Sequence, residues 1–119
     1  MTDNKTSDEL ADVAVEAMRV INELTRSRSR EWKYPGDVYS LIGGLSTMAM
    51  MLPQALDQAA RLIAGLNEGG HLRSDKDHQL EDDLGEIFHD LDAARTAAEK
   101  LYVSLTRAHS GLGSLTYKD

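Results

Sequence analysis

An unbroken alternation of four- and three-residue steps between apolar residues, from Leu80 to Leu112, constrains this chain more than any other feature. The positions that keep it are Leu80, Leu84, Ile87, Leu91, Ala94, Ala98, Leu101, Leu105, Ala108 and Leu112. This heptad spacing places apolar side chains on one face of an α-helix. The pattern predicts a helix of about 34 residues, or about 50 Å, which Gly111 and Gly113 end.

A second heptad register precedes the first one. Its positions are Val38, Ile42, Leu45, Ala49, Leu52, Leu56, Ala59, Ile63 and Leu66. Pro53 stands inside it, and an interior proline costs about 3 kcal/mol because it lacks an N–H and clashes with the preceding turn. We therefore predict one long helix that kinks near Pro53, with a break into two shorter helices, four in all, as the alternative.

A shorter amphipathic segment lies near the N-terminus. Ser7 can cap it, and Asp8 and Glu9 suit the positive end of the helix dipole. Its apolar residues are Leu10, Val13, Ala14, Ala17, Val20, Ile21 and Leu24. The predicted helix has about 23 residues and ends before Pro35, because the residue before a proline disfavours helical geometry.

These three segments define the predicted fold class. No segment alternates with the period of two that a half-buried strand requires, and the loops are short enough for neighbouring helices to be antiparallel. We predict an all-α antiparallel bundle of three long amphipathic helices. It forms a single domain over residues 1–119, with short flexible tails at both ends.

Composition narrows the classes of partner. The net charge of −7 repels phosphate groups, so we expect neither nucleic acid nor a membrane as a partner. The sequence has no cysteine, which removes disulfides and thiolate chemistry. The polar start, Met1 to Glu9, does not resemble a signal peptide, and no apolar run has the length of a membrane span. We expect a cytoplasmic protein.

Catalytic and metal-binding motifs find little support. Glu86 and His89 have the E-x-x-H spacing of carboxylate-bridged metal bundles, but such sites need a second copy of the motif, which the sequence lacks. The four histidines are scattered, and no nucleophile elbow or phosphate-binding loop is present. We predict no enzyme activity and no cofactor, and we keep a metal-binding bundle as the least favoured alternative.

A basic and aromatic segment joins the first two predicted helices and is the candidate partner-binding site. Its residues are Arg26, Arg28, Arg30, Trp32, Lys33 and Tyr34. Single-stranded nucleic acid and acidic protein surfaces are bound by such interleaved side chains. The same residues also suit a helix C-terminus, where cations oppose the dipole and aromatic rings close the end of a bundle. A nucleic-acid-associated protein is therefore the alternative function.

Self-association is the function that the patterns favour. The long helices carry more apolar surface than a three-helix bundle buries, because a further apolar register widens the face of the second helix. The candidate self-association residues are Leu41, Met48, Leu62, Phe88 and Tyr102. We predict a non-enzymatic helical interaction module that forms a homodimer, the commonest soluble oligomer. It also binds a protein partner whose identity the sequence does not give.

Three short stretches carry a resemblance to known proteins. They are Tyr34-Pro35-Gly36-Asp37-Val38-Tyr39, Gly44-Leu45 and Leu52-Pro53-Gln54-Ala55-Leu56-Asp57-Gln58. This middle third of the chain resembles uncharacterised small helical proteins of actinobacteria, and the resemblance implies no known activity. Trp32 between two helices is similar to the arrangement in secreted WXG-type hairpins, but position 34 is tyrosine rather than glycine.

Overall fold

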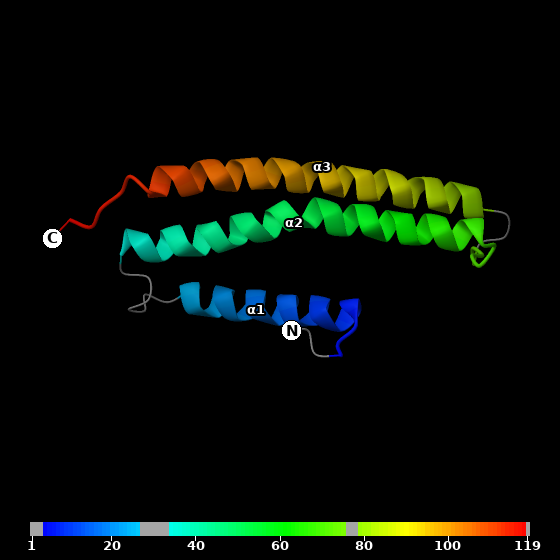
Figure 1. Ribbon diagram of the computed structural model, residues 1–119, viewed down its shortest axis with the longest axis horizontal. Helices are drawn as coiled ribbons and strands as arrows, with labels where there is room; N and C mark the ends of the chain where they lie inside the picture. Colours follow the sequence, from blue (N-terminus) through cyan, green and yellow to red (C-terminus); the bar gives the residue numbers. More distant parts are fainter. Residues whose placement is uncertain (1–3, 27–33, 76–78, 119) are drawn as a thin grey trace.

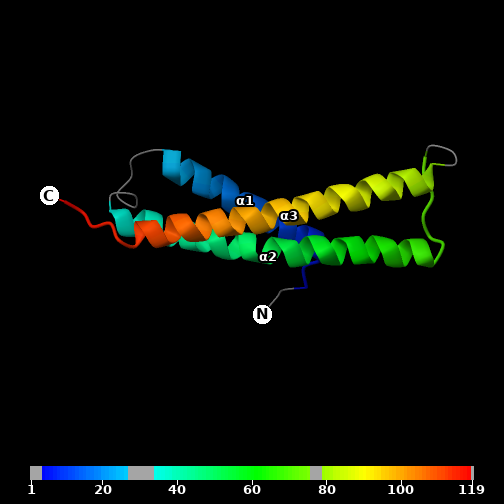
Figure 2. The ribbon, with the colours of Figure 1, turned by 90° about the horizontal axis from the view of Figure 1, so that it is seen from above.

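The computed structural model describes residues 4–26, 34–75 and 79–118, which contain three helices and no strand. They are α1 (Ser7–Arg26), α2 (Pro35–Glu68) and α3 (Leu80–Leu112). Helices α2 and α3 pack against each other and run in opposite directions (Figure 1). Helix α1 lies on the α2 side of this pair and crosses it at an angle when seen from above (Figure 2). The predicted all-α class is confirmed.

The start of α1 shows how the sequence fixes a helix end. Thr6 occupies the capping position that the sequence analysis assigned to Ser7, and Ser7 is the first helical residue. The Thr6 backbone N–H and hydroxyl donate to Glu9 Oε1 at 3.0 and 2.9 Å. These hydrogen bonds lower the pKa of Glu9 because they favour its charged form, and the bond from the Thr6 backbone has the largest effect. The carboxylate therefore helps to hold the first turn.

Helix α2 continues through Pro53. The described chain therefore has three helices, and the alternative with a break and a fourth helix is not found. Pro53 lies near the middle of the helix sequence and is half-buried. Figure 1 shows α2 changing direction near its middle, as expected where a proline removes one backbone hydrogen bond. The packing of α2 against α3 offsets the free energy lost with this hydrogen bond.

The end of α2 depends on a glycine with a positive φ. Gly70 has φ of +73°, a left-handed conformation that side chains with a Cβ disfavour. This geometry lets the N–H of His71 donate to the Leu66 carbonyl at 3.0 Å. The helix therefore ends at Glu68, and the Gly69-Gly70 pair forms the turn that follows it.

Small side chains form the centre of the contact between α2 and α3. Among the described residues the buried ones are Ser46 and Ala49 of α2 and Leu84 and Ala98 of α3. The Ser46 and Thr106 hydroxyls lie 3.2 Å apart and share a hydrogen bond across the pair. No large side chain of the described residues is fully buried. The core is a narrow line of contact rather than a filled interior.

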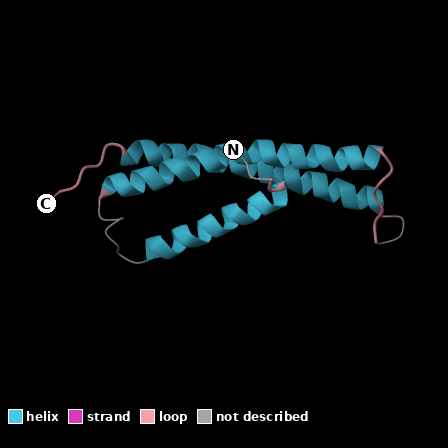
Figure 3. Ribbon diagram, turned by 60° about the horizontal axis from the view of Figure 1, so that its bottom comes forward, coloured by secondary structure: helices cyan, strands magenta, loops and turns pink. Residues whose placement is uncertain are grey.

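The described chain is elongated and open. Its radius of gyration is 19.4 Å, against about 13.5 Å for a compact domain of this length. None of the twenty residues of α1 is buried, and Figure 3 shows α1 diverging from the other two helices toward one end. The long helices therefore pack as a pair, while α1 covers little of them.

Replacing Gly70 by alanine tests the turn. We expect Gly70→Ala to lower the free energy of unfolding by about 1–2 kcal/mol, because a Cβ is strained at positive φ. Gly65→Ala is the matched control, since Gly65 lies inside α2 with open space where a Cβ would stand. That change should raise stability by about 0.5–1 kcal/mol. Urea unfolding measures both, and equal effects would contradict the assignment.

Lowering the pH tests the cap of α1. Because the pKa of Glu9 is lowered in the fold, its stabilisation is present above the ordinary carboxyl pKa and is lost as the pH falls through the lowered value. We expect the Thr6 amide, which donates to the Glu9 carboxylate, to lose protection against hydrogen exchange below about pH 4. Glu9→Gln should weaken this dependence, and Asp8 of the same turn should retain part of it because its hydrogen bond with Thr6 lowers its pKa too. Glu23→Gln, far from the cap, should leave the dependence unchanged.

Candidate functional site

One flank of the α2–α3 pair carries apolar side chains that no other described element buries. In α3 the predicted heptad line splits into two. Leu84 and Ala98 are buried, and Leu80, Leu91, Leu105 and Leu112 are half-buried. The other positions, Ile87, Ala94, Leu101 and Ala108, are exposed, with 39% of Ile87 and 47% of Leu101 accessible. Contact with α2 therefore uses only half of the pattern.

Helix α2 divides less sharply, because Val38, Leu45 and Ala59 of its second line are half-buried. Ala49 is buried and Ile42, Leu56 and Ile63 are half-buried, whereas Leu52 and Leu66 are 44% and 47% exposed. Near the loop end of the pair, a groove of about 470 Å³ is lined by Ile63, Leu84 and Ile87 together. Ala59 lies between Leu52 and Leu66 at heptad spacing and is half-buried. We call the surface formed by this line and the exposed line of α3 the open face: Leu52, Ala59, Leu66, Ile87, Ala94, Leu101 and Ala108.

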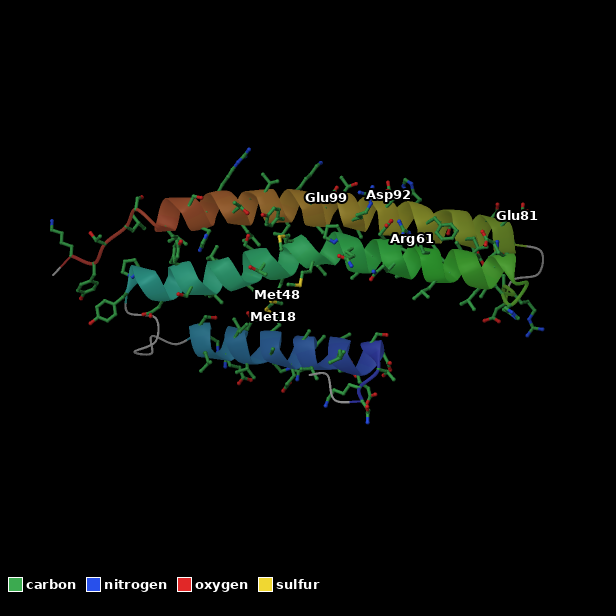
Figure 4. The ribbon with its side chains drawn as sticks, in the orientation of Figure 1. Met18, Met48, Arg61, Glu81, Asp92 and Glu99 are labelled. Atoms are coloured by element: carbon green, nitrogen blue, oxygen red, sulfur yellow. The ribbon has the colours of Figure 1, made fainter. Side chains whose placement is uncertain are left out.

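The opposite edge of the pair is polar. Arg95 of α3 donates to Asp92 at 2.7 Å and lies 3.4 Å from Glu99, both carboxylates being labelled in Figure 4. The hydrogen bond to Asp92, together with the charges of Asp92, Glu99 and Asp57, raises the pKa of Arg95. A groove of about 160 Å³ on this edge is lined by Asp57, Phe88 and Arg95 among others. The pair therefore has one apolar and one charged side.

Helix α1 carries a second exposed apolar surface. Met18 and Ile21 are half-buried, and Figure 4 shows Met18 opposite Met48 of α2. On the remaining part of the apolar face, Leu10, Val13, Val20 and Leu24 are 41–51% exposed. A strongly amphipathic helix gains most of its stability by burying its apolar face. The described contacts partly bury only Met18 and Ile21, at one edge of that face.

The candidate self-association residues fall in different environments. Met48 and Leu62 of α2 are 42% and 72% exposed, and Leu41 is half-buried. Phe88 lines the groove of the polar edge, and Tyr102 is half-buried. Sequence reasoning missed Ile87 and Leu101 as surface residues because both lie on the same heptad line as the core. The alternation of one buried and one exposed position becomes visible only when the neighbouring helix is placed.

The basic and aromatic candidate site is described only at its ends. Arg26 is the last residue of α1 and is exposed. The ring of Tyr34, which precedes α2, lies 4.9 Å from that of Tyr117 in an edge-on arrangement. Arg28, Arg30, Trp32 and Lys33 lie outside the described residues. Whether the six side chains form one surface stays a prediction.

The E-x-x-H pair does not assemble with other ligands in the described part of the chain. Glu86 and His89 are both exposed on α3, beside the acidic residues of its first turns. Within residues 4–26, 34–75 and 79–118, no group of three or more His, Asp or Glu side chains could hold a metal ion. The geometry at Glu86 is that of a charged helix surface.

A histidine contact lies at the end of the α2–α3 pair where α2 begins and α3 ends. The ring of His109 stacks on Tyr39 with centroids 3.9 Å apart. A Cβ at Gly43 would stand 2.9 Å from His109 Nε2, so glycine leaves the space that the ring occupies. This contact joins the start of α2 to the end of α3 and fixes their relative position. It explains why a helix otherwise suited to alanine contains glycine there.

Comparisons with known proteins give no further constraint. No protein-family model matches this chain, and neither a curated protein nor a solved structure matches it. Among the described helices, none combines the length and apolar character that crossing a membrane requires. The candidate site therefore rests on the open face and on the exposed face of α1.

Paired alanine substitutions test the histidine contact. Gly44→Ala should stabilise α2 by about 0.5–1 kcal/mol, because a Cβ there meets open space and alanine favours the helix. Gly43→Ala should give less stabilisation or a net loss, because its Cβ forces His109 to move. Thermal unfolding measures both. If the two variants gained equally, the contact would not constrain the pair.

Proposed function

We propose that this chain is a non-enzymatic helical interaction module that self-associates as a homodimer through its open face. The observation that carries the proposal is the large accessible surface area of the single chain. One chain exposes 9630 Å², whereas a compact monomer of its 13.1 kDa exposes about 6,400 Å². Stable protein interfaces bury about 1,200–2,000 Å² in total. The surplus is therefore large enough to form one.

The nature of the surplus supports protein association rather than catalysis. It includes aliphatic side chains in heptad lines, which is the pattern that packs helix against helix. Interfaces of this kind are depleted of charge at their centre, and Leu52, Ala94 and Leu101 of the open face carry none. Association adds neighbouring helices and so completes the antiparallel bundle that the sequence predicts.

The mass of the protein in solution tests this proposal. We expect light scattering after size exclusion to give twice the 13.1 kDa of one chain at micromolar concentration. Leu101→Lys should shift the protein toward the single-chain mass, because it places a charge in the apolar centre of the face.

Val103→Lys is the matched control. Val103 lies two residues further along α3 and is 45% exposed, close to the 47% of Leu101, but it lies outside the open face. Its substitution should leave the dimer intact. A wild-type mass of 13.1 kDa at these concentrations would refute the proposed function.

A further inference from the structure

Large and small side chains alternate along the exposed line of α3, so that the line is complementary to a second copy of itself running in the opposite direction. Its residues are large, small, large and small in order: Ile87, Ala94, Leu101 and Ala108. Read from the other end, the line is small, large, small and large. Two such helices placed antiparallel therefore set each large side chain opposite a small one. Ile87 meets Ala108 of the second copy, and Leu101 meets Ala94.

Resting on the proposed function, we infer that two copies of this chain join by packing α3 antiparallel against α3, about a two-fold axis near Ala97. Both pairings above have the same midpoint, between Ala97 and Ala98. The alternating line spans about 32 Å at 1.5 Å per residue. A two-fold axis makes each contact occur twice, as in other isologous dimers.

The next line of residues fits the same axis. Asp90, Ala97 and Ser104 lie beside the alternating line, on its side away from α2, and all three are exposed. In the antiparallel arrangement, Asp90 faces Ser104 of the second copy, so a hydroxyl donor meets a carboxylate acceptor. Ala97 faces its own symmetry mate, where a small uncharged residue allows the helices to approach closely.

Charge complementarity extends outward from this contact. The first part of α3, residues 80–92, holds six carboxylates and no lysine or arginine: Glu81, Asp82, Asp83, Glu86, Asp90 and Asp92. The later part contains Arg95, Lys100 and Arg107 against Glu99. Antiparallel pairing brings the acidic start of one helix beside the basic end of the other. Glu86 then lies at the level of Arg107 of the second copy, and both are exposed.

A parallel pairing lacks each of these matches. It sets Leu101 against Leu101 and leaves a gap between two copies of Ala94, so packing alternates between crowding and void. It also places the two sets of carboxylates side by side, where like charges repel. Size and charge both favour the antiparallel arrangement.

Helix α1 of the same chain fits the exposed line of α3 less well than the α3 helix of a second copy does. It lies on the α2 side of the pair (Figure 1), and its polar positions hold five carboxylates, Asp8, Glu9, Asp12, Glu16 and Glu23, against two arginines. Placing α1 on α3 brings these carboxylates beside Glu86 and Asp90. The second copy's α3 supplies Lys100 and Arg107 instead.

Cysteine cross-linking tests the axis directly, because the chain has no cysteine of its own. We expect Ala97→Cys to give a covalent dimer on oxidation or with a short bismaleimide, since thiols beside a two-fold axis meet their own mates. Thr96→Cys is the control, an adjacent exposed position on another side of α3. It should cross-link at least about tenfold more slowly.

A size swap tests the pairing. Ala94→Leu sets leucine against leucine, and Leu101→Ala sets alanine against alanine, so each should weaken the dimer about tenfold or more. Ala94→Leu combined with Leu101→Ala restores one large and one small residue in every pair. The double variant should return to within about threefold of the wild-type dissociation constant, measured by sedimentation equilibrium. Circular dichroism checks that each variant is helical.

The outcomes separate the two proposals. A wild-type dimer in which Ala97→Cys does not cross-link faster than Thr96→Cys, or in which the double variant is as weak as the single ones, would overturn the α3 pairing and leave the proposed function standing. A monomeric wild-type protein would overturn the proposed function itself. Rapid cross-linking at position 97 together with rescue by the swap establishes the pairing.

Discussion

The close contact between α2 and α3 through small side chains is the interaction on which the rest of the structure depends. Ser46, Ala49 and Ala98 are among the most buried residues described. Small residues let helix axes approach closely, and the distance between axes depends on the side chains at the contact. A close pair uses one line of each heptad pattern for its own contact. The second line of α3, together with Leu52 and Leu66 of α2, then has no partner within the pair.

The helices themselves could be predicted from the sequence with useful accuracy. The heptad line of α3 begins at Leu80 and ends at Leu112, as the helix does. Two glycines follow the last residue of α2, Glu68, and Pro35 is its first residue. These features are local, because periodicity and turn chemistry act over a few residues. The capping residue of α1 was misplaced by one position, and this helix has 20 residues rather than the predicted length of about 23.

The distribution of burial could not be predicted in the same way. A heptad line shows which residues share a face, but it does not show which half of that face an adjacent helix covers. Ile87 and Leu84 have the same sequence signature, yet one is exposed and the other buried. The same limit applies to α1, whose pattern predicts a buried face that the described contacts do not supply. Amphipathicity indicates that a helix needs a neighbour without specifying the neighbour.

The shallow core also has a consequence for how the chain persists in a cell. If folding and association are coupled, the folded fraction rises with the total amount of protein, because association stabilises by mass action. A large monomeric core makes stability independent of copy number, and this chain lacks such a core among its described residues. Newly made chains at low abundance would expose α1 and the open face to proteases. The abundance of the protein would then respond more than proportionally to its rate of synthesis.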